Sequence, residues 1–406
     1  MTDEDEVATD ELEPGSRPWE SYLRPSLSDR ARAAVSEAPE AVRALVESTI
    51  QASLLNPEEG LTLQEWLEWV AALPWGKPAR VESVDMVKAA RTLDHAHRGD
   101  DAVKAQVLDR IMASWVLAGA ESGHRTRPLL LVGPPGTGKS TLARATAEAM
   151  GLPCSFISVP MAVHDSVFLV GCARAYRSAE PGAIIQAVRA AGSRRIVFIL
   201  DELEKVRSDS ATDSPSAAPA LLELLDGHAT WLDRYLGVPF DLSEALFIAT
   251  ANSLAPIPEP LLDRCDVVTL PGLSPNQRLE AAQSHLWPRL IGDYQLPGSL
   301  VPMDQDALRC LVLDYASPGE EGLRAVGGRL EACLMRALRR GFDGVWPVPV
   351  TRSLIAECLG AAPEQPRPPD TKPARRVGFV VAHPVEASRA AAPDRESHEL
   401  RLEAPS

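Results

Sequence analysis

The segment Leu-Leu-Leu-Val-Gly-Pro-Pro-Gly-Thr-Gly-Lys-Ser, at residues 129–140, constrains the fold of this chain more than any other. Its four leading apolar residues predict a buried strand, and residues 143–150 have the apolar spacing of a helix. Between them lies the pattern Gly-x-x-x-x-Gly-Lys-Ser, at Gly133–Ser140. In a strand–loop–helix context, this pattern turns backbone N–H groups inward at a helix N-terminus, where they bind phosphate. The segment therefore predicts a site for a nucleoside triphosphate.

The end of this loop adds a charge and a metal ligand. Lys139 places a positive charge beside the β- and γ-phosphates, and the hydroxyl of Ser140 is a hard ligand for Mg²⁺. The residues of this segment that we expect to contact the nucleotide are Gly133, Pro134, Pro135, Gly136, Thr137, Gly138, Lys139, Ser140 and Thr141. A glycine-rich turn without a ligand is the alternative, and the flanking strand and helix disfavour it.

Composition excludes several other classes of protein. The 406 residues are 45% apolar, yet no apolar run approaches the roughly 18 residues of a membrane-spanning helix. The chain starts Met-Thr-Asp-Glu-Asp-Glu, which is acidic where a signal peptide is basic, so we expect a cytoplasmic protein. The six cysteines include no Cys-x-x-Cys pair, which fits neither a zinc site nor a disulfide framework. A net charge of −15 disfavours nucleic acid as the substrate.

Composition and periodicity divide the chain into five parts. We expect a disordered acidic N-terminus at 1–27, a helical segment at 28–75, a large nucleotide-binding domain at 76–271, a small helical domain at 272–360 and a Pro-rich, disordered tail at 361–406. After the loop, apolar runs predict strands at 154–159, 196–200, 246–250 and 267–270, with helices at 182–191 and 217–226. This alternation predicts an α/β fold with a doubly wound, mostly parallel sheet.

Helical spacing dominates the two ends of the sequence. Before the loop it predicts helices within 29–55, with a second one starting at Pro39, and at 61–73, 83–94 and 101–117. After the sheet it predicts helices at 275–290, 305–315, 321–340 and 352–359. Trp66 and Trp69 share one face of the helix at 61–73, and we interpret that face as a packing surface.

An apolar strand that ends in two carboxylates follows the loop, at Val-Phe-Ile-Leu-Asp-Glu, residues 197–202. Asp201 can hold Mg²⁺, and Glu202 can orient and polarise the attacking water. A strand that merely ends in an acidic turn is the alternative. The position of the pair downstream of a phosphate-binding loop favours the functional interpretation.

Three further polar residues complete the candidate site. Asn252 ends the strand Phe-Ile-Ala-Thr-Ala and would bind the γ-phosphate or the attacking water, because parallel strands bring their carboxyl ends to one crevice. Arg264 carries a planar fork that can stabilise charge on a transferring phosphoryl group, and Arg324 can reach the phosphates from a second domain. A surface salt bridge is the alternative for each arginine.

By its motifs the chain resembles the AAA+ ATPase portion of the Lon proteases, from about Leu63 to Gly360. The resemblance is carried by Trp-Leu-Glu-Trp at 66–69, Leu-Pro-Trp at 73–75, the loop at 133–140 and Phe-Ile-Leu-Asp-Glu-Leu-Glu-Lys at 198–205. More specific are Tyr-Leu-Gly-Val-Pro-Phe-Asp-Leu-Ser at 235–243 and Ile-Pro-Glu-Pro-Leu-Leu-Asp-Arg at 257–264. These two segments occur in the same order and at the same spacing as in the Lon family.

The resemblance implies a P-loop AAA+ fold that binds and hydrolyses ATP with Mg²⁺. It implies roles for Lys139 and Ser140 on nucleotide and Mg²⁺, for Asp201 and Glu202 as the Walker B pair, for Asn252 as sensor 1, for Arg264 as the arginine finger and for Arg324 as sensor 2. An arginine finger serves the nucleotide of a neighbouring subunit, so we expect a ring of identical copies, a hexamer in this family.

A loop that grips unfolded polypeptide in the family aligns with residues 171–182. Tyr176 falls on the aromatic position of that loop, and Arg177 replaces an apolar neighbour. A tyrosine ring can hold any chain by area burial, whereas Arg177 favours acidic or polar stretches. The chain also has His-Arg-Gly-Asp at 97–100, where the family has an aromatic-Gly-aliphatic run near adenine.

We also expect neither the large N-terminal substrate domain of the Lon family nor its Ser-Lys peptidase; for the peptidase, Lys372 is the last lysine and few serines follow it. We therefore expect a ring-forming ATPase that remodels or unfolds proteins without cleaving peptides. A nucleotide-dependent scaffold with little turnover is one alternative, and an ATPase that serves a peptidase on a separate chain is another. A nucleic-acid motor is disfavoured by the charge.

Overall fold

The computed structural model describes residues 25–55, 60–76, 85–97, 101–118, 126–206, 217–226 and 230–362, apart from single positions 166, 178, 343 and 345. The ends predicted to be disordered lie almost entirely outside these residues. The first helix, α1, begins at Leu27, earlier than predicted, because the Ser26 hydroxyl accepts a hydrogen bond from the Asp29 N–H at 3.2 Å and caps the helix. Within the described part of the chain, no helix is long and apolar enough to cross a membrane.

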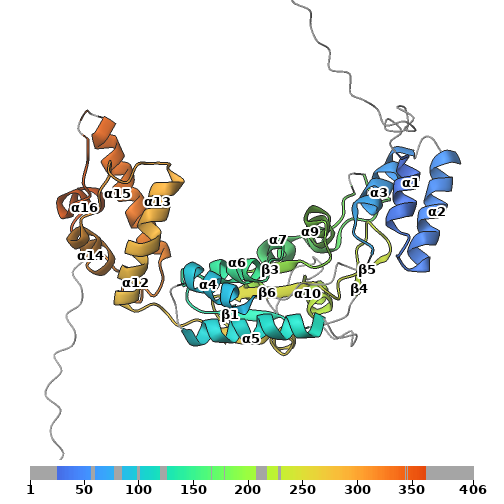
Figure 1. Ribbon diagram of the computed structural model, residues 1–406, viewed down its shortest axis with the longest axis horizontal. Helices are drawn as coiled ribbons and strands as arrows, with labels where there is room; N and C mark the ends of the chain where they lie inside the picture. The colour runs from blue at the N-terminus through green and yellow to red at the C-terminus, as the bar shows by residue number, and fades with distance from the viewer. Residues whose placement is uncertain are drawn as a thin grey trace, which may run out of the picture. The chain divides into compact units, whose positions relative to one another are not determined.

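A five-stranded sheet forms the centre of the nucleotide-loop region (Figure 1). Its strands are β1 (Leu129–Val132), β2 (Cys154–Ser158), β3 (Val197–Asp201), β6 (Leu246–Ala251) and β7 (Asp266–Thr269), in the order β2-β3-β6-β1-β7. All four strand pairs are parallel. The predicted α/β fold with a doubly wound, mostly parallel sheet is confirmed.

Strand register brings the functional ends of the strands together. Val132 of β1 lies opposite Ala251 of β6, and Leu200 of β3 lies opposite Ala249 of the same strand. The residues that follow β1, β3 and β6 therefore leave the sheet at one edge, as the carboxyl ends of parallel strands must.

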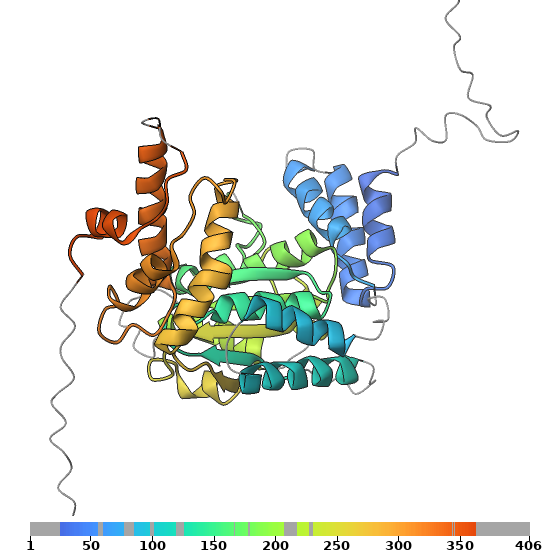
Figure 2. The ribbon, with the colours of Figure 1, turned by 60° about the vertical axis from the view of Figure 1, so that its left-hand side comes forward.

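Apolar residues cover both faces of the sheet, which is why its strands read as continuous apolar runs. Leu129 and Leu131 face a core shared with α4 (Met86–Ala96), α5 (Asp101–Ala118) and α6 (Lys139–Ala149). Leu130 and Val132 face a second core, to which α7 (Val159–His164), α9 (Ala183–Ala191), α10 (Ala217–Leu225) and α11 (Glu259–Leu262) contribute. Figure 2 shows helices packed against the sheet on both sides.

The N-terminal helices α1 (Leu27–Ala34), α2 (Glu40–Leu55) and α3 (Gly60–Ala72) contribute to the second core. Trp66 of α3 is fully buried, and its indole N–H donates to the Leu236 carbonyl at 3.2 Å. The ring of Trp69 lies under the guanidinium of Arg189 at 4.0 Å and against Tyr235 at 6.4 Å. The packing interpretation of these two tryptophans is confirmed.

The structure contains short elements that were not predicted from the sequence. A short antiparallel hairpin of β4 (Thr230–Leu232) and β5 (Pro239–Asp241) was not predicted, because three-residue strands give too little alternation to recognise. The short helices α7 and α8 (Val167–Val170) follow β2, where no helix was predicted. Pro160 occupies the first turn of α7, where its missing N–H costs nothing.

Residues 275–359 form helices around a core of their own. They are α12 (Pro275–Ala281), α13 (Trp287–Asp293), α14 (Gln305–Leu313), α15 (Arg324–Phe342) and α16 (Arg352–Leu359). The helix predicted at 275–290 is instead interrupted by a π-turn at Ala282–Leu286, because Pro288 lacks the N–H that a continuous α-helix uses. The helix predicted from Glu321 starts at Arg324, after a loop that contacts the phosphate-loop segment.

Candidate functional site

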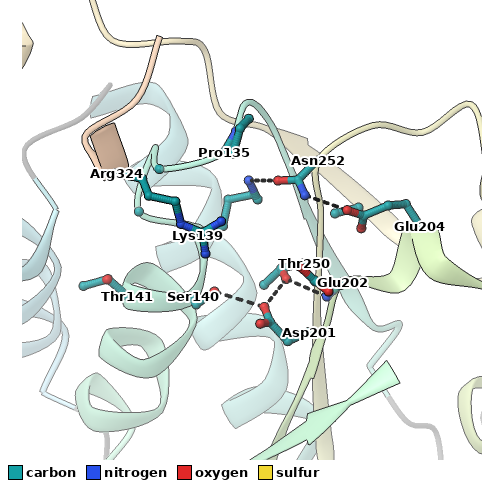
Figure 3. A pocket seen from close by; sticks show the side chains of 13 residues that line it. Pro135, Lys139, Ser140, Thr141, Asp201, Glu202, Glu204, Thr250, Asn252 and Arg324 are labelled. Atoms are coloured by element: carbon teal, nitrogen blue, oxygen red, sulfur yellow. Dashed lines mark hydrogen bonds between the residues drawn. The ribbon is translucent and has the colours of Figure 1, made fainter. Parts of the chain in front are cut away.

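A cavity of about 180 Å³ opens at the carboxyl edge of the sheet (Figure 3). It is lined by Pro135, Gly136, Gly138, Lys139, Ser140 and Thr141 from the loop, by Asp201, Glu202 and Glu204 after β3, by Thr250, Ala251 and Asn252 of the β6 strand and its end, and by Arg324. The structure therefore brings together the predicted loop, the carboxylate pair, Asn252 and Arg324, although they are far apart in sequence.

Backbone geometry shapes the loop for an anion. Gly138 precedes α6 with φ +92° and no side chain caps this helix start, so the first N–H groups of α6 have no partner from a cap. A Cβ on Gly133 would lie 2.3 Å from the carbonyl oxygen of Leu270, so only glycine fits there. An uncapped helix N-terminus with positive partial charge is a binding site for phosphate.

Lys139 is held at the centre of this cavity. Its Nζ donates to the carbonyl oxygens of Gly133 at 2.7 Å and Pro134 at 2.9 Å, and to Oδ1 of Asn252 at 2.9 Å. Burial lowers the pKa of the Lys139 ammonium, and the charges of Glu204 and Asp201 oppose that shift. A phosphate bound in the cavity would stabilise the same positive charge.

Hard oxygen atoms suited to Mg²⁺ lie beside the helix start. The Ser140 hydroxyl donates to Oδ1 of Asp201 at 3.0 Å, and the Thr250 hydroxyl donates to the same oxygen at 2.6 Å. Mg²⁺ in nucleotide sites takes one or two protein oxygens together with phosphate oxygens, which this donor set fits. Within the described ranges, no group of three His, Cys, Asp or Glu residues could hold a metal by itself.

Glu202 follows Asp201 in an unusual backbone conformation, with φ 62° and ψ 51°. A non-glycine residue rarely occupies this left-handed region, and such strain concentrates at functional sites. The backbone N–H of Glu202 donates to Oγ1 of Thr250 at 3.3 Å. Thr250 thus fixes both acidic residues: its hydroxyl orients Asp201, and it receives the N–H of Glu202.

Thr250 and Glu204 are cavity residues that the sequence interpretation missed. Nδ2 of Asn252 donates to Oε1 of Glu204 at 2.6 Å, as Figure 3 shows. A signal for each was present in the sequence. Thr250 lies in β6 two positions before Asn252, which follows the strand, and Glu204 lies two positions after Glu202.

Six of the predicted site residues do not line this cavity: Gly133, Pro134 and Thr137 of the loop segment, and Arg264, Tyr176 and Arg177. Arg264 does not line this cavity; its Nε donates to Asp226 at 2.6 Å and its NH1 to the Pro260 carbonyl at 2.7 Å. Tyr176 and Arg177 lie in an exposed loop, where the tyrosine is 68% exposed. The run at 98–100, expected near adenine, lies outside the described residues, although His97 lies within 3.1 Å of where a Cβ on Gly138 would be.

Comparison with known proteins finds a matching family model and several similar proteins. Residues 129–273 match the family model described as "ATPase family associated with various cellular activities (AAA)". The chain is 36% identical over 309 residues to a Lon protease of Desulfovibrio desulfuricans, 34% identical over 322 residues to one of Halothermothrix orenii, and 38% identical over 333 residues to Lon protease 4 of Sorangium cellulosum. These alignments cover 75%, 78% and 79% of this chain, but only 34%, 40% and 40% of the relatives.

Proposed function

We propose that this Lon-like AAA+ module binds ATP with Mg²⁺ and hydrolyses it in the cavity at the carboxyl edge of the sheet. Phosphoryl transfer needs positioning and charge stabilisation more than covalent chemistry, and the cavity offers both. The observation that best supports this proposal is that the hydroxyls of Ser140 and Thr250 both donate to Oδ1 of Asp201, at 3.0 Å and 2.6 Å. That arrangement orients a carboxylate next to a phosphate-binding helix start.

Each residue then has a defined task. Lys139 and the N–H groups of the loop bind the phosphates, and Ser140 with Asp201 would hold Mg²⁺. The metal would neutralise charge on the phosphates and fix their orientation. Glu202 accepts a proton from the attacking water, and Asn252 hydrogen-bonds the γ-phosphate or that water. Arg324 adds positive charge from the start of α15.

We further propose that the active form is a ring, a hexamer as in the Lon family, in which Arg264 completes the site of the neighbouring copy. Arg264 is absent from the cavity of its own chain, and its side chain is 31% exposed. Its hydrogen bonds to Asp226 and the Pro260 carbonyl hold the guanidinium in a fixed orientation. A head-to-tail contact of identical copies, closed by rotation, forms such a ring.

Subunit mixing tests this proposal directly. Arg264→Ala copies keep Glu202 but lack the arginine, whereas Glu202→Gln copies keep the arginine but lack the carboxylate. Each variant alone should have little ATPase activity. In a mixed ring, an Arg264→Ala site next to a Glu202→Gln copy has both groups, so mixing should restore activity. No recovery on mixing, together with activity per copy that is independent of protein concentration, would argue against action between subunits.

The work that we propose for this ATPase is the remodelling of protein substrates. The exposed loop of Tyr176 and Arg177 is anchored at its base, since buried Asp233 accepts from the N–H of Gly182 at 2.7 Å. Within the loop, Arg174 stacks on Trp66 at 4.6 Å. An aromatic ring on a firmly anchored loop can transmit force to an unfolded chain. The protease activity named in the relatives is not carried over, because the chain matches only 34–40% of their length.

Stimulation of ATPase activity by an unfolded protein such as casein tests the proposed remodelling of protein substrates. Tyr176→Ala should keep the basal rate and lose the stimulation, whereas Tyr294→Ala, a change at another exposed tyrosine, should keep both. A wild-type chain that binds ATP but shows no turnover with or without casein would favour the nucleotide-dependent scaffold instead.

A further inference from the structure

Glu204 is a third carboxylate in the cavity, and the tasks described above leave it without a role. It lies on the short helix η2 (Leu203–Lys205) and is only 9% exposed. Its Oε1 accepts from Asn252 at 2.6 Å, whereas its Oε2 is buried and has no hydrogen-bond partner among the described residues. A buried carboxylate with an unsatisfied oxygen costs stability, so its presence calls for a functional reason.

The two partners of Asn252 define which way its amide points. Lys139 has only donors and meets the amide oxygen at 2.9 Å, whereas the Glu204 carboxylate has only acceptors when ionised and meets the amide nitrogen at 2.6 Å. The reversed amide would set its NH₂ group against an ammonium and its oxygen against a carboxylate. Both contacts would be repulsive, so the orientation is fixed by the chemistry of the two neighbours.

Binding of a triphosphate would change the hydrogen bonds of Asn252, because phosphate oxygens compete with the Asn252 amide oxygen for the Lys139 ammonium. When Lys139 turns toward phosphate, Glu204 is the remaining group that holds the amide. One N–H of Asn252 then stays on Glu204, and the amide oxygen remains directed into the cavity. That oxygen is an acceptor, which suits the hydrogen of an attacking water and not the oxygen of a phosphate.

We propose that Glu204 is a positioning residue for ATP hydrolysis: it holds the Asn252 amide so that the amide oxygen faces the attacking water. This inference rests on the proposed function, since it concerns the same reaction. It assigns Glu204 no contact with substrate, and it favours water over the γ-phosphate as the partner of the Asn252 oxygen. Glu204 should therefore affect the rate of ATP hydrolysis only by orienting Asn252.

The test is a double-mutant cycle on the full chain with saturating Mg²⁺. Glu204→Ala removes the acceptor and should lower kcat by roughly tenfold to hundredfold, the range for a lost charged hydrogen bond, with KM for ATP changed less than about twofold. Asn252→Ala should lower kcat as well. The double variant should be no slower than Asn252→Ala within about twofold, because coupled residues are not additive.

Conservative variants separate positioning from other roles. Glu204→Gln keeps an oxygen that can accept from Asn252, so it should retain kcat within about threefold of wild type and leave the pH profile unchanged. Loss of activity as severe as in Glu202→Gln would instead identify Glu204 as a proton acceptor. The melting temperature of Glu204→Ala should be unchanged or higher. Glu320→Ala should lower it, since Glu320 is a buried glutamate paired with Arg278 and Arg329.

Two further results would overturn the proposal while leaving the proposed function intact. In the first, the two single effects multiply in the double variant, so Glu204 acts independently of Asn252. In the second, Glu204→Ala hydrolyses ATP at the wild-type rate. A wild-type chain that hydrolyses no ATP would instead overturn the proposed function, and this inference with it.

Discussion

Replacing Thr250 with valine should weaken the response of the ATPase to Mg²⁺. Valine has nearly the shape of threonine, and Thr250 is 2% exposed, so the change opens no cavity. It removes the hydroxyl that donates to Asp201 at 2.6 Å and accepts from the Glu202 N–H at 3.3 Å. Loss of such a supporting hydrogen bond reduces metal affinity by about 10- to 100-fold, or about 1.4–2.7 kcal/mol.

The assay is a Mg²⁺ titration of ATPase activity at saturating ATP, with binding of a fluorescent ATP analogue in EDTA as a second readout. Thr250→Val should raise the half-saturating Mg²⁺ concentration by about 10- to 100-fold and leave the affinity for nucleotide without metal within about twofold of wild type. Thr250→Ser should behave as wild type because it keeps the hydroxyl.

The matched control is Thr146→Val, which removes another buried hydroxyl, bonded to the Leu142 carbonyl at 2.8 Å within α6. It should lower stability without moving the Mg²⁺ midpoint. If Thr250→Val left the midpoint unchanged, or if Thr146→Val moved it equally, the proposed role of Thr250 in orienting Asp201 would be wrong.

Two further predictions concern the loop and the helix beside it. Gly133→Ala should weaken nucleotide binding at least about tenfold in a nucleotide titration, because the added Cβ would lie 2.3 Å from the Leu270 carbonyl oxygen. Gly292→Ala is the control: a Cβ there would meet no atom within 4 Å, so nucleotide binding should not weaken. Burial and the Lys104 charge lower the pKa of His97, so nucleotide-free protein should lose stability below about pH 6.5, by at most about 1.4 kcal/mol per pH unit. Melting temperatures of His97→Asn between pH 7.5 and 5.5 should fall less than those of wild type, and a parallel fall would contradict this assignment.

The direction of the pH dependence follows from the fact that the folded state favours neutral His97. Because the pKa of His97 is lower in the folded state than in the unfolded state, the native state binds fewer protons than the unfolded chain between those two pKa values. Protonation of the unfolded chain then draws the equilibrium toward unfolding, from about pH 6.5 down to the folded-state pKa. The stability contributed by neutral His97 is complete above that window and is lost through it.

The sheet could be predicted from sequence because its strands are buried on both faces. The run Leu129–Val132 is apolar throughout, and so is most of Val197–Asp201, up to the acidic residue that enters the cavity. The hairpin at 230–241 could not be predicted, since its three-residue strands are stabilised by contacts with α3 and the loop before α9. Local sequence carries no record of such distant contacts.

The grouping of residues around the cavity could be predicted where each residue belongs to a recognisable segment. The phosphate loop, Asp201 and Asn252 belong to patterns that include their neighbours in sequence, and the structure places them around one cavity. The spacing of Thr250 and Glu204 from Asn252 and Glu202 did not by itself reveal their importance, which depends on side-chain contacts with Asp201 and Asn252, 49 and 48 positions away. Asp226 as a partner of Arg264 is a similar case, because the two residues are 38 positions apart in the sequence.

The most direct test of the central claim compares ATP binding with ATP turnover in Glu202→Gln. Wild type should release phosphate, and the variant should bind ATP with a Kd within about twofold of wild type but turn it over at least about 100-fold more slowly. Glu148→Gln, at an exposed position in α6, should match wild type in both measurements. Phosphate release by Glu202→Gln at the wild-type rate would contradict hydrolysis of ATP at this cavity with Glu202 as the proton acceptor.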